Sequence, residues 1–93
     1  MIKSFKCRET EKLWESGRSR RVPNTILGVA LRKLLMIDSA CEVGDLRCPP
    51  ANNLEPLCGN RKGQWSIRIN KQWRICFVWQ GQDAFEVEIV DYH

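Results

Sequence analysis

Two arginines stand at matching positions in one strongly basic segment. The segment GNRKGQWSIRINKQWRICFVW, residues 59–79, carries five basic side chains and no acidic one. Folding it as a hairpin would place Arg68 and Arg74 opposite each other, an arrangement that is destabilising unless an anion offsets it. If the last strand returns beside the hairpin, Tyr92 and His93 lie near the same face. A basic face lined by a tyrosine and a histidine is typical of proteins that bind a phosphate backbone.

The same charges also fit an unremarkable solvated surface. In the register argued below, Glu88 falls opposite Cys76 and close to Arg74, where its carboxylate would compensate the arginines. On pattern alone this is the commoner arrangement. Residues 56–82 contain no acidic side chain at all, however, and this favours the phosphate-binding interpretation.

The elements that position these residues must fit in 93 residues, enough for one compact domain spanning 1–93. A hydrophobic content of 43% supports a core, and 28% charged residues is ordinary for a globular protein. No apolar run reaches the length of a membrane span, and the start MIKSF lacks the apolar region of a signal peptide. We therefore expect a cytoplasmic protein.

Five cysteines are spread along the chain without a closely spaced pair: Cys7, Cys41, Cys48, Cys58 and Cys76. Nothing in the sequence indicates an oxidising compartment, and zinc sites normally need tighter spacing. We expect free thiols, no metal and no cofactor.

Two helices are predicted in the first half. The first spans Glu9–Ser16 and ends at Gly17, and the second begins at Pro23–Thr25 and runs to about Ala40. Apolar residues recur in the second helix at three- and four-residue spacing, which indicates one buried face: Ile26, Leu27, Ala30, Leu31, Leu34, Leu35 and Ile37. Residues 1–5 are predicted as a short strand, and Cys48–Asn53, with two prolines, as an exposed loop.

Alternating apolar residues predict the strands. Residues 65–69, 73–79 and 85–90 alternate, and Leu54 and Leu57 open a further short strand that ends at Gly59. A three-residue loop, Asn70–Gln72, pairs Trp65 with Phe77 and Ile67 with Ile75, which keeps each face consistent, whereas a two-residue loop mixes apolar and charged partners. The final hairpin is aligned with Phe77 opposite Val87, Trp79 opposite Phe85 and Arg74 opposite Val90. This order of elements predicts an α+β fold.

The hairpin segment, followed by VEIVDYH at the end of the sequence, closely resembles the HigB-type toxins of the RelE superfamily, also called plasmid maintenance killer proteins. The similarity runs from MIKSF through ALRKLLMIDSA to the last residue. It implies a RelE-like α+β fold, with two N-terminal helices on one face of an antiparallel sheet of four to five strands. It also implies a ribosome-dependent endoribonuclease that cuts A-site mRNA and halts translation. The implied partners are the ribosome and a HigA-type helix-turn-helix antitoxin, and operator DNA only through that antitoxin.

Site residues follow from the same resemblance. The active-site arginine matches Arg74, and the C-terminal catalytic residues match Tyr92 and His93, with Asp91 beside them. The residues expected to bind RNA phosphates come from the charge pattern instead: Arg68 on the face of Arg74, Arg61 and Lys62 in a loop at one end of that face, and Lys71 in the hairpin turn. Two positions depart from the family pattern, because Glu55 stands where some HigB toxins have a histidine and Cys58 stands where they have a lysine.

These residue types suit metal-independent RNA cleavage by the 2′-hydroxyl. Arg74 would stabilise charge on the phosphate, and His93, with an ordinary pKa near 6.5, would transfer protons. Tyr92 would serve as acid or base or stack on a base. Glu55 either takes over as a base or only caps the turn at Pro56.

Other functions remain open from the residues alone. A terminal histidine such as His93 is commonly inert, and the basic face could grip RNA without cleaving it. The basic N-terminal residues either dock on ribosomal RNA or form a solvated helix face: Lys3, Lys6, Arg8, Lys12, Arg18, Arg20 and Arg21. A DNA-binding repressor is less favoured, because no helix has the pattern of a recognition helix.

Overall fold

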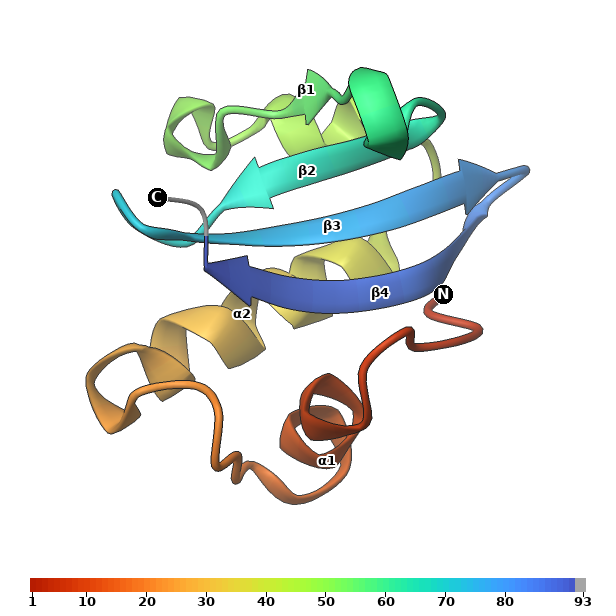
Figure 1. Cartoon of the computed structure of the whole chain (residues 1–93). Helices are drawn as coiled ribbons and strands as arrows, with labels where there is room; N and C mark the ends of the chain where they lie inside the picture. Colours follow the sequence, from red (N-terminus) through yellow and green to blue (C-terminus); the bar gives the residue numbers. More distant parts are fainter. Residues whose placement is uncertain (92–93) are drawn as a thin grey trace.

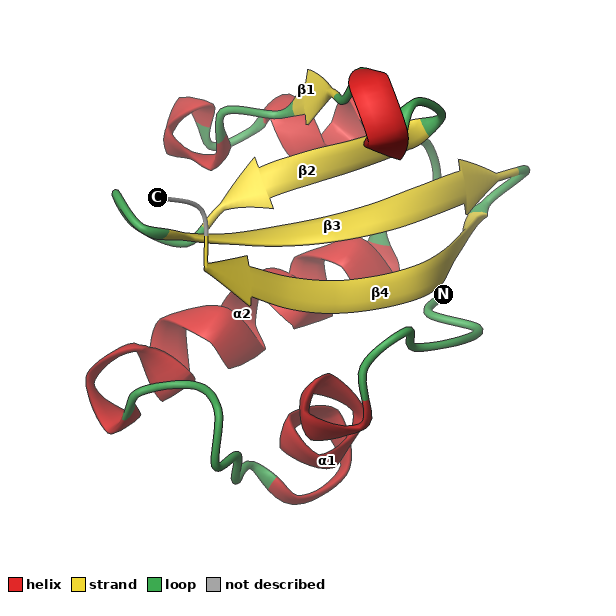
Figure 2. Cartoon of the chain, viewed as in Figure 1, coloured by secondary structure: helices red, strands yellow, loops and turns green. Residues whose placement is uncertain are grey.

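The computed structural model describes residues 1–91, which form two helices and a four-stranded antiparallel sheet (Figures 1 and 2). The helices α1 (Arg8–Ser16) and α2 (Leu27–Ser39) precede the strands β1 (Glu55–Pro56), β2 (Gln64–Arg68), β3 (Trp73–Gln80) and β4 (Asp83–Asp91), which lie in that order across the sheet. The predicted α+β class is confirmed. No helix in residues 1–91 is long and apolar enough to cross a membrane.

Both predicted helices form close to their expected limits. Gly17 ends α1 in a left-handed conformation, with φ at 77°, and its N–H donates to the carbonyl of Leu13. Such a conformation favours glycine because it has no Cβ. A single 3₁₀ turn, Asn24–Ile26, leads into α2.

The core lies between the helices and the sheet. Leu13 of α1 and Leu34 and Ile37 of α2 are completely buried, as are the sheet residues Ile67, Ile75, Phe77, Val87 and Ile89. Burying a side chain of this size stabilises the fold by about 1.5–3 kcal/mol. The predicted apolar face of α2 is wrong at Leu35, which is 57% exposed because it lies on the solvent side of the helix.

The β2–β3 hairpin has the predicted register. Trp65 pairs with Phe77, Ile67 with Ile75 and Arg68 with Arg74. The side chain of Asn70 holds the turn, because its Oδ1 accepts hydrogen bonds from the N–H groups of Gln72 and Trp73, each 2.8 Å long. The apolar alternation and this local bond specify the same pairing.

The β3–β4 hairpin follows its predicted register only at one end. Arg74 pairs with Val90 and Cys76 with Glu88, but beyond a β-bulge Val78 pairs with Phe85 and Trp79 with Ala84. The predicted pairing of Trp79 with Phe85 is therefore wrong. The extra residue is on β4, where Glu86 has a φ of 55°, and the bulge shifts the register by one residue.

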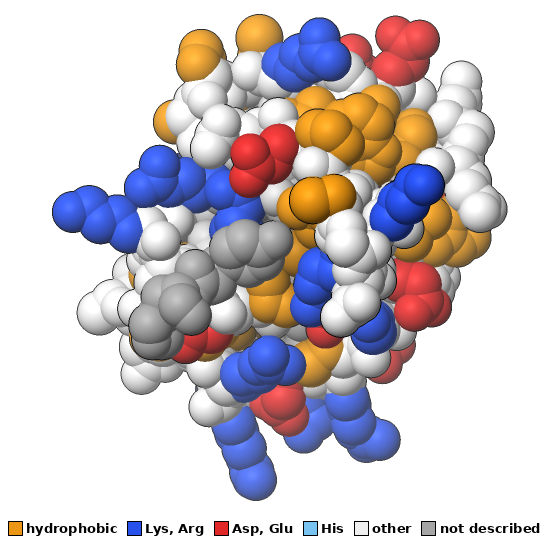
Figure 3. All heavy atoms as spheres, turned by 45° about the horizontal axis from the view of Figure 1, so that its top comes forward, with side chains coloured by type: hydrophobic (Ala, Val, Ile, Leu, Met, Phe, Trp, Pro, Cys, Tyr) orange, Lys and Arg blue, Asp and Glu red, His pale blue; other side chains and the backbone are white. Residues whose placement is uncertain are grey.

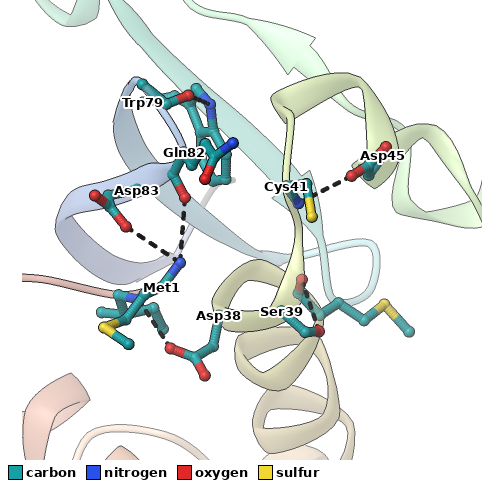
Figure 4. Close-up of polar contacts among 11 residues, drawn as sticks. Met1, Asp38, Ser39, Cys41, Asp45, Trp79, Gln82 and Asp83 are labelled. Carbon is teal, nitrogen blue, oxygen red and sulfur yellow. Dashed lines mark hydrogen bonds and ion pairs between the residues drawn. The ribbon is translucent and has the colours of Figure 1, made fainter.

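Residues 1–5 run beside β4 without forming a full strand. Two isolated parallel bridges join Ile2 to Ala84 and Phe5 to Val87. The amine of Met1 lies 3.5 Å from Asp83 Oδ1, and the N–H of Ile2 donates to Asp38 Oδ1 (2.9 Å), so the segment ties the β3–β4 turn to the end of α2 (Figure 4).

The segment between α2 and β1 is more ordered than predicted. Residues 50–52 form a 3₁₀ turn, and Asn52 is completely buried, contrary to the expectation of an exposed loop. The amide of Asn52 donates to the carbonyls of Leu46 (3.1 Å) and Cys48 (3.3 Å), and its Oδ1 accepts from Lys33 Nζ. Asn52 thus fixes the segment to α2.

Candidate active site

Arg74 lies on the sheet face opposite the apolar core and is only 8% exposed. Its Nε donates to Ser66 Oγ (2.9 Å) on the neighbouring strand, and its Nη2 donates to the carbonyl of Asn53 (2.9 Å). Asn53 is left-handed, with φ at 48°, and ends the 3₁₀ turn that follows Pro49. The guanidinium group is therefore held in a fixed orientation by β2 and by the segment before β1.

Glu55 is an acidic partner of Arg74. Glu55 Oε1 lies 3.2 Å from Arg74 Nη2, and the Glu55 side chain is 47% exposed. The expectation that Glu88 would compensate Arg74 is wrong, because the Glu88 carboxylate binds Arg61 and Lys6 instead. Because the Glu55 side chain is half exposed, water screens its interaction with Arg74, and an anionic ligand can compete with the carboxylate.

One row of residues crosses the sheet beside Arg74. Glu55 pairs with Ser66, Ser66 with Cys76, and Cys76 with Glu88. Ser66 and Cys76 are small and completely buried, so they form the floor between two carboxylates. Burial raises the pKa of the Cys76 thiol, which therefore stays protonated and uncharged at neutral pH.

Arg61 lies on this face but faces a carboxylate. Its Nη1 donates to Glu88 Oε1 (2.8 Å) and to Gln64 Oε1 (3.2 Å), and Lys6 Nζ lies 3.9 Å from the same Glu88 oxygen. Sequence reasoning grouped Lys6 with the basic N-terminal residues and did not place it on this face. The predicted short strand at residues 1–5 was the one indication that Lys6 lies near the sheet. The sequence pattern did not specify that this segment would lie beside β4.

The other predicted phosphate-binding residues lie at two separate ends of the hairpin. Arg68 is opposite Arg74, as predicted, and its Nε donates to the carbonyl of Asn70 (3.0 Å). Lys71 is exposed in the β2–β3 turn, whereas Lys62 is exposed before β2. Arg68 and Lys71 thus belong together, and Lys62 lies near Arg61 instead. Figure 3 shows Lys and Arg side chains gathered on the side where Figure 1 places the β2–β3 turn.

Asp91 ends β4 opposite Trp73, and its Oδ2 accepts a hydrogen bond from Gln72 Nε2 (3.0 Å). It is therefore close to the β2–β3 turn. Tyr92 and His93, the predicted catalytic pair, lie outside the described residues.

The chemistry of the face suits an anion. Arg74 offers fixed donors, and Ser66 and Asn53 set its orientation. Within residues 1–91, no three Cys, Asp or Glu side chains come together as a metal site. The hydrogen bond between Ser66 and Arg74 and the contribution of Asn53 were not predicted from the sequence.

Solved structures of low sequence identity share the fold of this chain. A crystal structure of a mutant of YafQ from E. coli matches with a TM-score of 0.66 and 12% sequence identity, covering 98% of this chain and 91% of that one. The YoeB/ParE toxin from Agrobacterium tumefaciens matches with a TM-score of 0.50 and 16% identity, covering 99% and 96%. At these identities the likeness establishes the fold, which is RelE-like as predicted.

Sequence relatives are much closer. The chain is 44% identical over 80 residues to Toxin HigB-1 of Vibrio cholerae, covering 85% of this chain and 84% of the relative. It is 39% identical to Endoribonuclease HigB of Proteus vulgaris over the full length of both chains. Residues 3–93 match the family described as the RelE-like toxin of the type II toxin–antitoxin system HigB. The chain therefore belongs to the HigB-like toxins of type II toxin–antitoxin systems, which implies that it acts together with an antitoxin.

Proposed function

We propose that this toxin is a ribosome-dependent endoribonuclease that cleaves mRNA in the ribosomal A site and thereby inhibits translation. The family and the Proteus relative, which is named an endoribonuclease, support this activity. The observation that carries the proposal is the orientation of Arg74, a buried cation whose guanidinium is aligned by Ser66 and Asn53. Preorganised donors of this kind stabilise charge that develops on a phosphate.

The proposed reaction is attack of the RNA 2′-hydroxyl on the adjacent phosphorus. A bond forms between the 2′-oxygen and phosphorus, and the bond from phosphorus to the 5′-oxygen breaks. A base takes the 2′-hydroxyl proton, and an acid supplies a proton to the leaving 5′-oxygen. We assign these two roles to Tyr92 and His93, with Asp91 beside them, and the stabilisation of the phosphate charge to Arg74.

Glu55 would take part in this reaction in one of two ways. Its carboxylate lies against Arg74 and on the same face, so it is placed to act as the base or to be displaced by the phosphate. We favour displacement, because the carboxylate and the phosphate would compete for the same guanidinium group. Arg61, Lys62, Arg68 and Lys71 would bind phosphates along the strand.

The proposed setting is the cytoplasm. There a HigA-type helix-turn-helix antitoxin would hold the toxin inactive. Operator DNA would be contacted only through that antitoxin.

Expression of the protein in bacterial cells tests the activity. Induction is expected to arrest growth and to produce new 5′ ends within the coding regions of ribosome-bound messages, detected by primer extension. Arg74→Ala and deletion of Tyr92–His93 should each abolish the new ends. Circular dichroism and thermal unfolding would verify that the variants still fold. Undiminished cleavage by either variant would refute the site assignment.

One observation favours a second candidate function, a non-catalytic RNA-binding module. The family resemblance implies a histidine and a lysine where this chain has Glu55 and Cys58, and Glu55 already pairs with Arg74. This function predicts RNA affinity that falls steeply with salt, without new 5′ ends after induction.

A further inference from the structure

A pocket of about 520 Å³ lies between α2 and the β2–β3 turn. Four of its lining residues are cations: Arg32 and Lys33 of α2, Arg68 of β2 and Lys71 of the turn. Val29 and Ala51 contribute apolar walls. Among residues 1–91 no carboxylate lines the pocket, so the charge of its described walls is uniformly positive.

These cations have no acidic partner in the described part of the chain. None of the four forms an ion pair with a carboxylate of residues 1–91. Lys33 is only 6% exposed, and the acceptor of its ammonium group is the neutral side-chain oxygen of Asn52. Burial, followed by the charge of Arg32, lowers the pKa of Lys33. A buried cation without a counter-charge costs free energy, and an anion in the pocket would relieve that cost.

One residue, Arg68, links the pocket to the position of Arg74. Arg68 lines the pocket and is the cross-strand partner of Arg74. Directly opposed residues have Cβ atoms about 5 Å apart, so their long side chains can serve neighbouring phosphates of one strand. The volume exceeds that of a phosphate group and leaves room for the attached ribose against Val29 and Ala51.

We propose that this pocket binds a backbone phosphate of the RNA strand, next to the linkage held at Arg74. The inference rests on the proposed function for the identity of the strand. Arg32 and Lys33 are the additional binding residues, and Arg68 joins the two positions.

Binding of a short RNA that cannot be cleaved tests the inference separately from catalysis. The probe is a single-stranded tetranucleotide in which every 2′-hydroxyl is methylated, titrated by NMR into the whole protein. Arg32→Gln is the test variant, because Arg32 is exposed and its loss leaves the core intact. Arg47→Gln is the control, because it removes the same charge from an exposed arginine that does not line the pocket.

We expect Arg32→Gln to weaken binding about tenfold, as for the loss of a charge-assisted hydrogen bond. The slope of log affinity against log salt should become shallower by about 0.7, the value for one phosphate contact on a single strand. The amide signals of Asn70 and Lys71 should shift on binding in the wild type, and these shifts should shrink in the variant. Arg47→Gln should change none of these quantities.

Two results would overturn the inference. One is that Arg32→Gln and Arg47→Gln bind the tetranucleotide equally well. The other is that Arg32→Gln leaves tetranucleotide binding unchanged but weakens binding to ribosomes that carry no mRNA. The phosphate in the pocket would then belong to ribosomal RNA. A protein that never cleaves ribosome-bound mRNA, but loses tetranucleotide affinity in Arg32→Gln, would refute the proposed function and leave the phosphate pocket supported.

Discussion

The sheet face around Arg74 and the pocket at the β2–β3 turn are both basic, but they differ in how their charge is balanced. On the sheet face, Glu55 pairs with Arg74, and Glu88 pairs with Arg61 and Lys6. In the pocket, Arg32 and Lys33 have no carboxylate partner within residues 1–91. A phosphate that binds Arg74 therefore competes with the Glu55 carboxylate. A phosphate that enters the pocket displaces no carboxylate of residues 1–91.

This difference separates catalysis from binding. A balanced site holds its side chains in a defined geometry before the substrate arrives, which suits stabilisation of a transition state. An unbalanced pocket attracts polyanions from a distance. The following variants test whether the sheet face serves catalysis and the pocket serves binding.

The largest effect is expected from Arg74→Lys. The variant keeps the positive charge, but one ammonium group cannot reproduce the planar donors that bind Ser66, Asn53 and an anion together. We expect cleavage of ribosome-bound mRNA to fall at least about a hundredfold, measured as the rate of new 5′ ends. Near-wild-type cleavage would mean that only charge matters at this position.

A large loss of stability is expected from Asn52→Ala. This change leaves Lys33 without its acceptor and the carbonyls of Leu46 and Cys48 without their donor. Unsatisfied buried groups cost about 1–3 kcal/mol each, so we expect the free energy of unfolding in urea to fall by about 2–3 kcal/mol. Asn53→Ala is not a suitable control for this loss. Asn53 has a left-handed backbone conformation, which alanine adopts less readily, and it binds Arg74 through its backbone carbonyl.

The buried thiol of Cys76 should make stability depend on alkaline pH. Its pKa is raised by burial, so the folded protein keeps the thiol proton at pH values where the unfolded chain loses it. The stabilisation is present below pH 9.0, the ordinary value, and is lost as the pH rises through the raised pKa. One thiol changes the free energy of unfolding by at most about 1.4 kcal/mol per pH unit.

Urea unfolding of the wild type and Cys76→Ala between about pH 8 and 10.5, a range that brackets the ordinary thiol pKa, would measure this effect. Other groups, including Lys33, titrate in both proteins and cancel in the comparison. The stability of the wild type should decrease more steeply with rising pH than that of the variant. Parallel curves would show that Cys76 does not contribute.

The smallest expected effect is a gain in affinity for RNA. Glu55→Gln removes the carboxylate that competes for Arg74 and keeps the shape of the side chain. Because the Glu55 side chain is half exposed and its charge is screened by water, we expect affinity for the methylated tetranucleotide to rise only about three- to fivefold. Glu86→Gln, at an exposed carboxylate without an ion pair in residues 1–91, is the matched control. Weaker cleavage together with tighter binding in Glu55→Gln would instead identify Glu55 as the base.

The parts of the fold that could be predicted are those determined by local pattern. The β2–β3 register follows from apolar alternation on both sides of Asn70, and that residue also bonds its own turn. The end of α1 follows from Gly17. In each case the determining residues are neighbours in the sequence.

The features that were missed depend on distant parts of the chain. The N–H of Glu86, at the bulge in β4, donates to Ser4 Oγ, 82 residues away in the sequence. The pairing of Arg74 with Glu55 depends on β1, which has only two residues and no apolar alternation to specify its register. The burial of Lys33 depends on Asn52. Asn52 follows two prolines in a segment that the sequence predicts to be exposed. No local pattern specifies these contacts.

Residues 1–6, which lie beside β4, affect whether two copies of the toxin can associate through the edges of their sheets. The backbone of Ala84 and Val87 is hydrogen-bonded to residues 1–6, and the N–H of Ile89 donates to Thr10 Oγ1 of α1. At the opposite border of the sheet, β1 is only two residues long. Such borders offer little backbone to which a strand from a second molecule could add. The fold thereby resists edge-to-edge aggregation without relying on a bound antitoxin to cover β4.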